Sequence, residues 1–310
     1  MGEFNEKLLR AAAWGDLQGV LKATADGADI NTRSRGKETP FMLYLRSGRA
    51  QPSDIATFVS LGADLNVQDR LGYTAVASAA REGILTPSLL DALSAAGADL
   101  NIRTYKTGDT PLLLVAKEGY LTPPLLEAFC KGGANPRAIN KTTGRSIADM
   151  TIGTIYFSLP LFRMFAKYGV PGIHPEWEHD LNARDGAGNT ALHWCAAKRA
   201  FDINLDLLVN FLFDGADPNA KDNEGENFLM TLSRRQILSE GHISVYLKWG
   251  GEADARNKEN RNLLFFTAGA GATELLLGNG ADPCVRSTGG DTVLTWGAKR
   301  GFRYETMLAL

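Results

Sequence analysis

Cysteine is scarce in this 310-residue sequence, and its distribution argues against a fold held together by disulfides. The three cysteines are Cys130, Cys195 and Cys284, which lie far apart, and no Cys-x-x-Cys pair occurs. An odd, scattered set of this kind does not build a disulfide framework and favours a reducing compartment. Each cysteine has apolar or small neighbours, so we interpret all three as small buried hydrophobic residues.

Long apolar runs and a leader peptide are also missing. No run approaches the roughly 18 apolar residues that a membrane span requires. Residues 1–15 contain no basic segment followed by an apolar core, which is the pattern of a signal peptide. We therefore expect a cytoplasmic protein that does not bind membranes, although a signal peptide that had been removed would leave this sequence unchanged.

An excess of charge of either sign is absent. The chain has 33 Lys and Arg against 35 Asp and Glu, a formal net charge of -2. A partner attracted by charge would therefore have to meet a local patch. The pI of about 6.1 argues against nucleic-acid binding. The composition, 44% hydrophobic and 22% charged, is that of a soluble globular protein.

Familiar catalytic motifs do not occur either. The sequence has no G-x-x-x-x-G-K-[ST], no G-x-S-x-G and no H-E-x-x-H. The glycines at 289–290 and at 269 and 271 are interpreted as turn and repeat residues rather than as a phosphate-binding loop. We therefore expect a protein that is not an enzyme and that needs no cofactor, metal or small-molecule substrate.

What the sequence does contain is a repeated pair of short markers. One is a terminator, G-A-D-x-N, and the other is an opener in which Thr, Ser or Asn precedes proline or an apolar residue. Terminators begin, in full or weakened form, at Gly27, Gly62, Gly97, Gly133, Gly215, Gly251 and Gly280. The first four glycines, at positions 27, 62, 97 and 133, are 35, 35 and 36 residues apart. The openers begin at Thr39, Thr74, Thr110, Ser146, Thr190, Asn227, Asn262 and Thr292.

Local physical chemistry explains why such markers bracket helices. A Thr, Ser or Asn side chain can accept a hydrogen bond from the free N–H groups of a first helical turn, and proline fits the next position. Glycine after a helix adopts the left-handed cap conformation, and Asp and Asn suit the turn that follows. Between the markers, apolar residues recur at helical spacing, for example over 112–116 and 125–129. The pattern predicts pairs of short helices.

This pattern resembles the ankyrin repeat family over nearly the full length of the chain. The most specific match is T-A-L-H-W-C-A-A at 190–197 with D-G-A-D-P-N-A at 214–220. The resemblance implies an all-α ankyrin-repeat solenoid, in which each unit of about 33 residues is a β-turn followed by two antiparallel helices. It also implies that His193 hydrogen-bonds the neighbouring turn. The chain departs from the family in keeping this histidine in one unit and in lengthening the connections at 85–90 and 121–126, where Pro87 and Pro123 are expected to begin second helices.

We expect residues 1–310 to form a single array. An N-terminal cap at 5–32 is followed by eight repeats, at about 33–67, 68–103, 104–138, 139–183, 184–221, 222–256, 257–286 and 287–310. The repeat at 257–286 is short, with a compressed helix pair, and the repeat at 139–183 carries an insertion at 170–181.

The insertion contains the densest group of ionisable residues in the chain. Two histidines and three carboxylates lie within His174 to Asp180, together with Trp177. A solvated loop is the favoured interpretation. A divalent-metal site and a partner-binding loop anchored by an exposed Trp177 remain alternatives.

The ankyrin resemblance places a partner on the concave side, which is formed by the turn tips and the exposed side of the first helices. Residues just after the seven-residue stretch that starts at each opener are mostly basic, and we infer a basic stripe on this side whose compensating acid lies elsewhere. Helix-dipole complementarity is the alternative explanation for these bases. The expected partner-binding residues are Arg46, Tyr73, Arg81, Tyr105, Lys117, Trp177, Trp194, Lys198, Arg234, Arg235, Trp296, Lys299 and Arg300.

The function expected from these observations is that of a non-catalytic protein-binding scaffold, a monomer on its own, whose partner has an acidic or mixed surface. One alternative is a dedicated inhibitor or immunity protein that blocks a toxin or hydrolase, since the chain resembles stand-alone bacterial ankyrin proteins. A further alternative is an enzyme or metal site at 173–180.

Overall fold

The computed structural model describes residues 2–154, 157–198, 200, 205–267 and 269–310. These residues form 17 α-helices and two short 3-10 helices, and their only β-type pairing is an isolated bridge between Arg286 and Thr292. The predicted all-α fold of paired helices is confirmed. The chain forms two compact units: unit 1 comprises 1–156 with 167–172, and unit 2 comprises 157–166 with 173–310.

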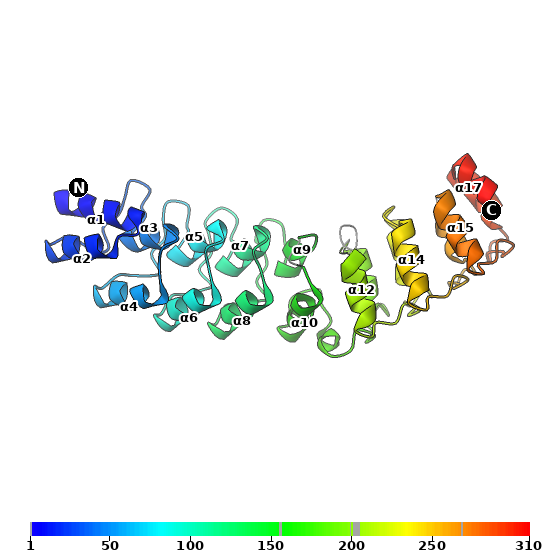
Figure 1. The fold of residues 1–310 in the computed structure, drawn as a ribbon, viewed down its shortest axis with the longest axis horizontal. Helices are drawn as coiled ribbons and strands as arrows, with labels where there is room; N and C mark the ends of the chain where they lie inside the picture. Colours follow the sequence, from blue (N-terminus) through cyan, green and yellow to red (C-terminus); the bar gives the residue numbers. More distant parts are fainter. Residues whose placement is uncertain (1, 155–156, 199, 201–204, 268) are drawn as a thin grey trace. The chain divides into compact units, whose positions relative to one another are not determined.

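Unit 1 consists of helix pairs arranged in two rows. In one row each first helix packs on the next, from α1 through α3, α5 and α7 to α9, and in the other row α4 packs on α6 and α6 on α8 (Figure 1). The helices are α1 (Glu3–Trp14), α2 (Leu17–Ala25), α3 (Pro40–Arg46), α4 (Pro52–Ser60), α5 (Ala75–Glu82), α6 (Pro87–Ala95), α7 (Pro111–Lys117), α8 (Pro123–Lys131) and α9 (Ile147–Thr151).

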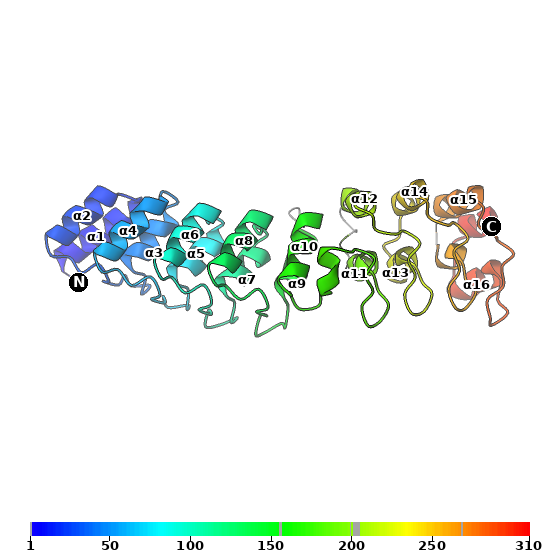
Figure 2. The ribbon, with the colours of Figure 1, turned by 90° about the horizontal axis from the view of Figure 1, so that it is seen from below.

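Unit 2 repeats this arrangement with more irregular parts. The row of first helices contains α11, α13, η2 and α16, and the row of second helices contains α12, α14 and α15, with α17 packed on α15 (Figure 2). The elements are α10 (Leu159–Lys167), η1 (Pro175–Glu178), α11 (Ala191–Ala197), α12 (Leu205–Phe213), α13 (Phe228–Arg234), α14 (Glu240–Lys248), η2 (Leu263–Phe266), α15 (Ala270–Gly278), α16 (Val293–Arg300) and α17 (Tyr304–Ala309). In the part of the chain that the structure describes, no helix is both long enough and apolar enough to span a membrane.

The openers begin the first helices as predicted. Six of the eight accept a hydrogen bond from the backbone N–H three residues on, namely Thr39, Thr74, Thr110, Ser146, Asn227 and Thr292. The two exceptions use their side chains differently. The hydroxyl of Thr190 lies 2.9 Å from Nδ1 of His193, and the amide of Asn262 donates to Asp254. Pro87 and Pro123 begin α6 and α8, which confirms that the longer connections end at proline.

The terminators link each repeat to the next through an asparagine four residues after the glycine. The amide of Asn66 donates to the carbonyl of Gly97 at 3.0 Å, and its oxygen accepts from the N–H of Asp99 at 2.7 Å. Asn31 and Asn101 form the same two bonds in unit 1, and Asn182 and Asn219 form them in unit 2. These asparagines form a ladder that satisfies turn backbone groups across repeat boundaries.

One terminator was misplaced by a single residue. The glycine with positive φ is Gly250, at 84°, and not Gly251. A Cβ at Gly251 would lie 2.4 Å from the ring of Tyr246, so this second glycine makes room for the tyrosine. With the register corrected, Asp254 occupies the ladder position. It still accepts from the N–H of Asp282 at 3.0 Å, but a carboxylate has no N–H to donate. The amide of Asn262 donates to the carbonyl of Asp282 at 2.9 Å instead.

The insertion at 170–181 is anchored in the core by Trp177, while six of its twelve residues are exposed to solvent. Trp177, on η1, is 1% exposed, its ring stacks on Phe162 of α10 with centroids 5.8 Å apart, and its Nε1 donates to the carbonyl of Ala183 at 2.8 Å. The prediction of an exposed Trp177 is therefore wrong. The turn sequence D-L-N resumes only at 180–182, and the intervening residues place an indole where α10 would otherwise leave apolar surface uncovered.

Candidate partner-binding site

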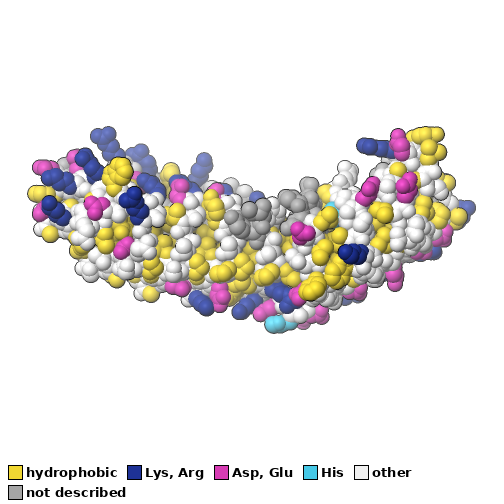
Figure 3. All heavy atoms as spheres, in the orientation of Figure 1, with side chains coloured by type: hydrophobic (Ala, Val, Ile, Leu, Met, Phe, Trp, Pro, Cys, Tyr) yellow, Lys and Arg dark blue, Asp and Glu magenta, His cyan; other side chains and the backbone are white. Residues whose placement is uncertain are grey.

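The predicted partner-binding residues do not share one environment. Tyr105 is 66% exposed, and seven basic side chains are exposed, namely Arg46, Lys117, Lys198, Arg234, Arg235, Lys299 and Arg300. Tyr73, Arg81 and Trp296 are half-buried. In unit 1, Lys and Arg side chains project along the edge where α1, α3, α5 and α7 lie (Figure 3).

Trp194 is a second residue whose predicted exposure is wrong. It is 8% exposed, and its ring lies 5.5 Å from Phe162 and 6.5 Å from Trp177, centroid to centroid. The rings of Phe162 and Trp177 therefore cover Trp194. The Lys198 ammonium lies 5.9 Å from the Trp194 ring centroid, on an exposed side chain at the edge of this cluster.

Most of the predicted basic stripe is neutralised within its own repeat. In four repeats an acidic residue directly before the opener pairs with the base at the end of the first helix, eight residues later. The pairs are Glu38 with Arg46, Asp109 with Lys117, Glu226 with Arg234, and Asp291 with Lys299. The expectation that the compensating acid lies elsewhere is therefore wrong. The repeat supplies base and acid together, so these four bases contribute little net positive potential.

Glu226 in the pair with Arg234 is buried, as is Asp109 in the pair with Lys117, whereas Glu38 and Asp291 are partly exposed. The Glu226 side chain is 3% exposed, and its Oε1 accepts from Nη2 of Arg234 at 2.6 Å and from Nδ2 of Asn257 at 3.3 Å. Burial raises the pKa of Glu226, while Arg234 and Asn257 oppose that shift. Arg234 therefore has a structural partner before any binding partner arrives.

His193 has the structural role that the ankyrin resemblance implied. It is 1% exposed, and its Nε2 lies 2.9 Å from the carbonyl oxygen of Glu226. Because a carbonyl can only accept, Nε2 carries the proton and Nδ1 accepts from the Thr190 hydroxyl. Burial lowers the pKa of His193, the largest of the effects acting on it. This histidine is neutral and fully hydrogen-bonded, which does not favour an acid–base role.

The cysteines fall into three environments. Cys195 is fully buried, and burial raises the pKa of its thiol well above the usual value. Cys130 is half-buried, and burial raises its pKa to about 11. The interpretation as a buried hydrophobic residue is wrong for Cys284, which is exposed because it occupies the ladder position after Gly280. All three are free thiols.

The histidines and carboxylates of 173–180 do not converge. Across the described ranges, which include this whole segment, no three His, Cys, Asp or Glu side chains lie close enough to hold a metal ion. The ring of His179 is exposed and lies 3.6 Å from Glu178, while the ring of His174 packs against Trp177. The insertion therefore does not present the set of ligands that a metal site would need.

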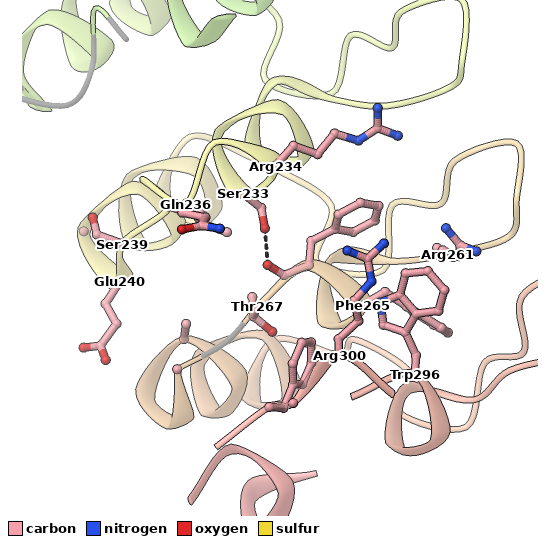
Figure 4. A pocket seen from close by; sticks show the side chains of 17 residues that line it. Ser233, Arg234, Gln236, Ser239, Glu240, Arg261, Phe265, Thr267, Trp296 and Arg300 are labelled. Carbon is pink, nitrogen blue, oxygen red and sulfur yellow. Dashed lines mark hydrogen bonds between the residues drawn. The ribbon is translucent and has the colours of Figure 1, made fainter. Parts of the chain in front are cut away.

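Unit 2 contains a pocket of about 1060 Å³ that is lined by residues of α13, η2 and α16 and by the starts of α14 and α15 (Figure 4). Its lining includes three predicted residues, Arg234, Trp296 and Arg300, together with Arg261 and Phe265. The guanidinium carbon of Arg261 lies 3.9 Å from the Trp296 ring centroid, that of Arg300 lies 4.8 Å from it, and Phe265 packs at 6.2 Å.

Sequence reasoning missed Arg261 and Phe265 because neither follows an opener on a full-length helix. The available signal was the compressed repeat at 257–286. Its first helix is η2, a 3-10 helix of 4 residues, between α13 with 7 residues and α16 with 8. The short element leaves space between its two longer neighbours.

Comparison with known proteins supports the repeat assignment in one segment. Residues 187–223, which contain α11, α12 and the turn after them, match the ankyrin repeat family. Among curated proteins, none matches the chain.

Proposed function

We propose that this chain, which carries an ankyrin repeat at 187–223 within an all-helical structure of paired helices, is a non-catalytic scaffold that binds a partner protein. Ankyrin repeats generally mediate protein–protein interactions, and this match is the observation that carries the proposal. The division of residues 1–310 into a cap and eight repeats is part of the same proposal, as is a reducing, cytoplasmic compartment, which the three free thiols support.

The first-helix row of unit 2 is the binding surface that we favour. Arg235 and Arg300 are exposed there, and neither has an ion pair within the described part of the chain. Trp and Arg are enriched among residues that dominate binding energies at interfaces, and the pocket presents both types. A partner with an acidic or mixed surface would complement these charges and associate faster for it.

Site-specific photo-crosslinking in source cells tests the scaffold proposal. A photo-reactive amino acid replaces Arg235, at the end of α13, and in a matched strain it replaces Lys248, which is exposed at the end of α14 in the other row. A protein captured from position 235 and not from 248 supports a partner on the first-helix row. Equal capture from both positions, or none from either, contradicts it.

A dedicated inhibitor is a second candidate for the same surface. If the captured protein is an enzyme, purified chain added in equimolar amount should abolish its activity under the inhibitor hypothesis and leave that activity intact under the adaptor hypothesis.

A further inference from the structure

The pocket in unit 2 arises from a defect in the repeat. Each residue of an α-helix advances the axis by about 1.5 Å, so a first helix reduced to one 3-10 turn ends well short of its neighbours. The chain leaves η2 at Thr267, while α13 and α16 continue on either side to Arg234 and Arg300. Side chains from these two longer helices therefore face each other across the space that η2 does not fill.

Two of the three arginines in this pocket are already paired with carboxylates, which leaves Arg300 and Glu240 as its charges without an ion pair among the described residues. Its lining contains three arginines and one glutamate, Glu240, which lies across the pocket from Arg261 and Trp296 (Figure 4). Arg234 is paired with buried Glu226, and Arg261 is paired with Glu259 at 2.5 Å. Arg300 has no carboxylate partner among the described residues, so its guanidinium, held beside the Trp296 ring, is available to a ligand.

The apolar part of the pocket lies directly beside this free charge. Phe265 is 3% exposed and forms part of the lining with the half-buried Phe266, Trp296 and Phe302. A volume of about 1060 Å³ is at the upper end of the range for ligand pockets and far exceeds what one inorganic anion fills. The occupant must therefore combine a carboxylate with apolar bulk.

We propose that this pocket binds an extended segment of the partner protein in which a carboxylate side chain adjoins an aromatic one, the carboxylate pairing with Arg300 and the ring packing against the half-buried Trp296 and Phe266. This inference rests on the proposed scaffold function and names the part of the partner that is recognised. Arginine suits the role because its planar fork can bond a carboxylate through two N–H groups while stacking on an indole.

Peptide pools test the inference without knowledge of the partner. The probe is a pool of fluorescent nonapeptides with a fixed central Phe-Glu pair and mixed flanking residues, and the control pool has Phe-Gln. Binding is measured by fluorescence polarisation to wild type, Arg300→Gln and Arg235→Gln. The two variants remove the same charge from exposed positions, but Arg235 does not line the pocket.

Wild type should bind the Phe-Glu pool saturably and the Phe-Gln pool more weakly. Arg300→Gln should weaken binding by about tenfold, as the loss of a charge-assisted hydrogen bond does, and Arg235→Gln by less than about twofold. Thermal unfolding curves that overlay confirm that both variants fold. Equal losses in the two variants, or no saturable binding to wild type, overturn the inference. Neither result would contradict the scaffold proposal, which the crosslinking experiment tests separately.

Discussion

Nη2 of Arg234 lies 2.6 Å from Oε1 of Glu226, eight residues earlier, and the pair joins the end of α13 to the residue before its opener. The same spacing pairs base and acid in three other repeats. The Glu226 carboxylate is almost wholly buried, at 3% exposure, whereas that of Asp291 in the pair with Lys299 is 19% exposed. The first prediction concerns this difference in burial.

Replacing Arg234 by alanine should lower the free energy of unfolding by about 1–3 kcal/mol, because Glu226 would keep only Asn257 as a side-chain partner while buried. Chemical denaturation measures the loss. Lys299→Ala is the matched control, since Asp291 is more exposed and an exposed pair contributes about 0–1 kcal/mol. Adding Glu226→Gln to Arg234→Ala should restore most of the stability, and a double variant as unstable as the single one would contradict this explanation.

His193 should make stability depend on pH in one direction. Burial lowers its folded pKa below the ordinary histidine value of 6.5, so the unfolded chain binds more protons than the folded chain as the pH falls through 6.5. The stabilisation is therefore present above pH 6.5 and is lost as the pH drops toward and through the folded pKa. Denaturation midpoints of wild type and His193→Asn, measured between about pH 7.5 and 5, should converge on acidification. A constant difference would show that His193 does not titrate in this way.

Gly97→Ala should destabilise unit 1 by about 1–2 kcal/mol through backbone strain alone. Gly97 has a φ of 90°, and a Cβ there would meet no atom within 4 Å, so steric overlap is not involved. Gly278→Ala is the matched control, because it too has open space but lies in α15 without a positive φ. That change should be neutral or slightly stabilising. Urea midpoints of the two variants decide, and equal effects would refute the conformational argument.

Trp177→Ala should act on stability rather than on partner binding. The indole is 1% exposed and stacks on Phe162, so truncation should cost about 3–5 kcal/mol. Trp177→Phe should cost less, because the ring is kept and only the Nε1 bond to Ala183 is lost. Denaturation curves test the order. Unchanged stability in Trp177→Ala would contradict the burial of the indole and would favour the partner-binding interpretation of Trp177.

The regular parts of the fold were predictable from sequence because their signals are local. A threonine that caps a helix bonds three residues away, and a glycine with positive φ acts at its own position. Such markers located the helices at Thr74 and the turn at Gly97 without knowledge of packing. The terminator near Gly250 shows the limit of this approach. Two consecutive glycines look alike in sequence, and only the ring of Tyr246 distinguishes their roles.

The candidate site was less predictable because its features depend on neighbours in space. Trp194 and Trp296 occupy the same position after their openers. Trp177 of the insertion covers Trp194, whereas the short η2 leaves Trp296 half-buried. Seven of the eight predicted basic residues are exposed, but the acidic residues that pair with four of them were not predicted. The acid eight residues earlier lies in the turn, outside the helix that the pattern predicts. The structure of that turn is needed to see that the acid lies close to the base.

Glu226 also has a consequence for how the molecule opens. Its carbonyl accepts from His193, its carboxylate binds Arg234 in its own repeat, and the same carboxylate binds Asn257 beyond it. Repeat proteins ordinarily couple each unit to its nearest neighbours in sequence. Here one residue bonds to segments of three successive repeats of unit 2, so we expect these segments to unfold cooperatively. Amide hydrogens of α11, α13 and the 257–262 turn should then exchange with solvent at a common rate, set by the unfolding of these segments together.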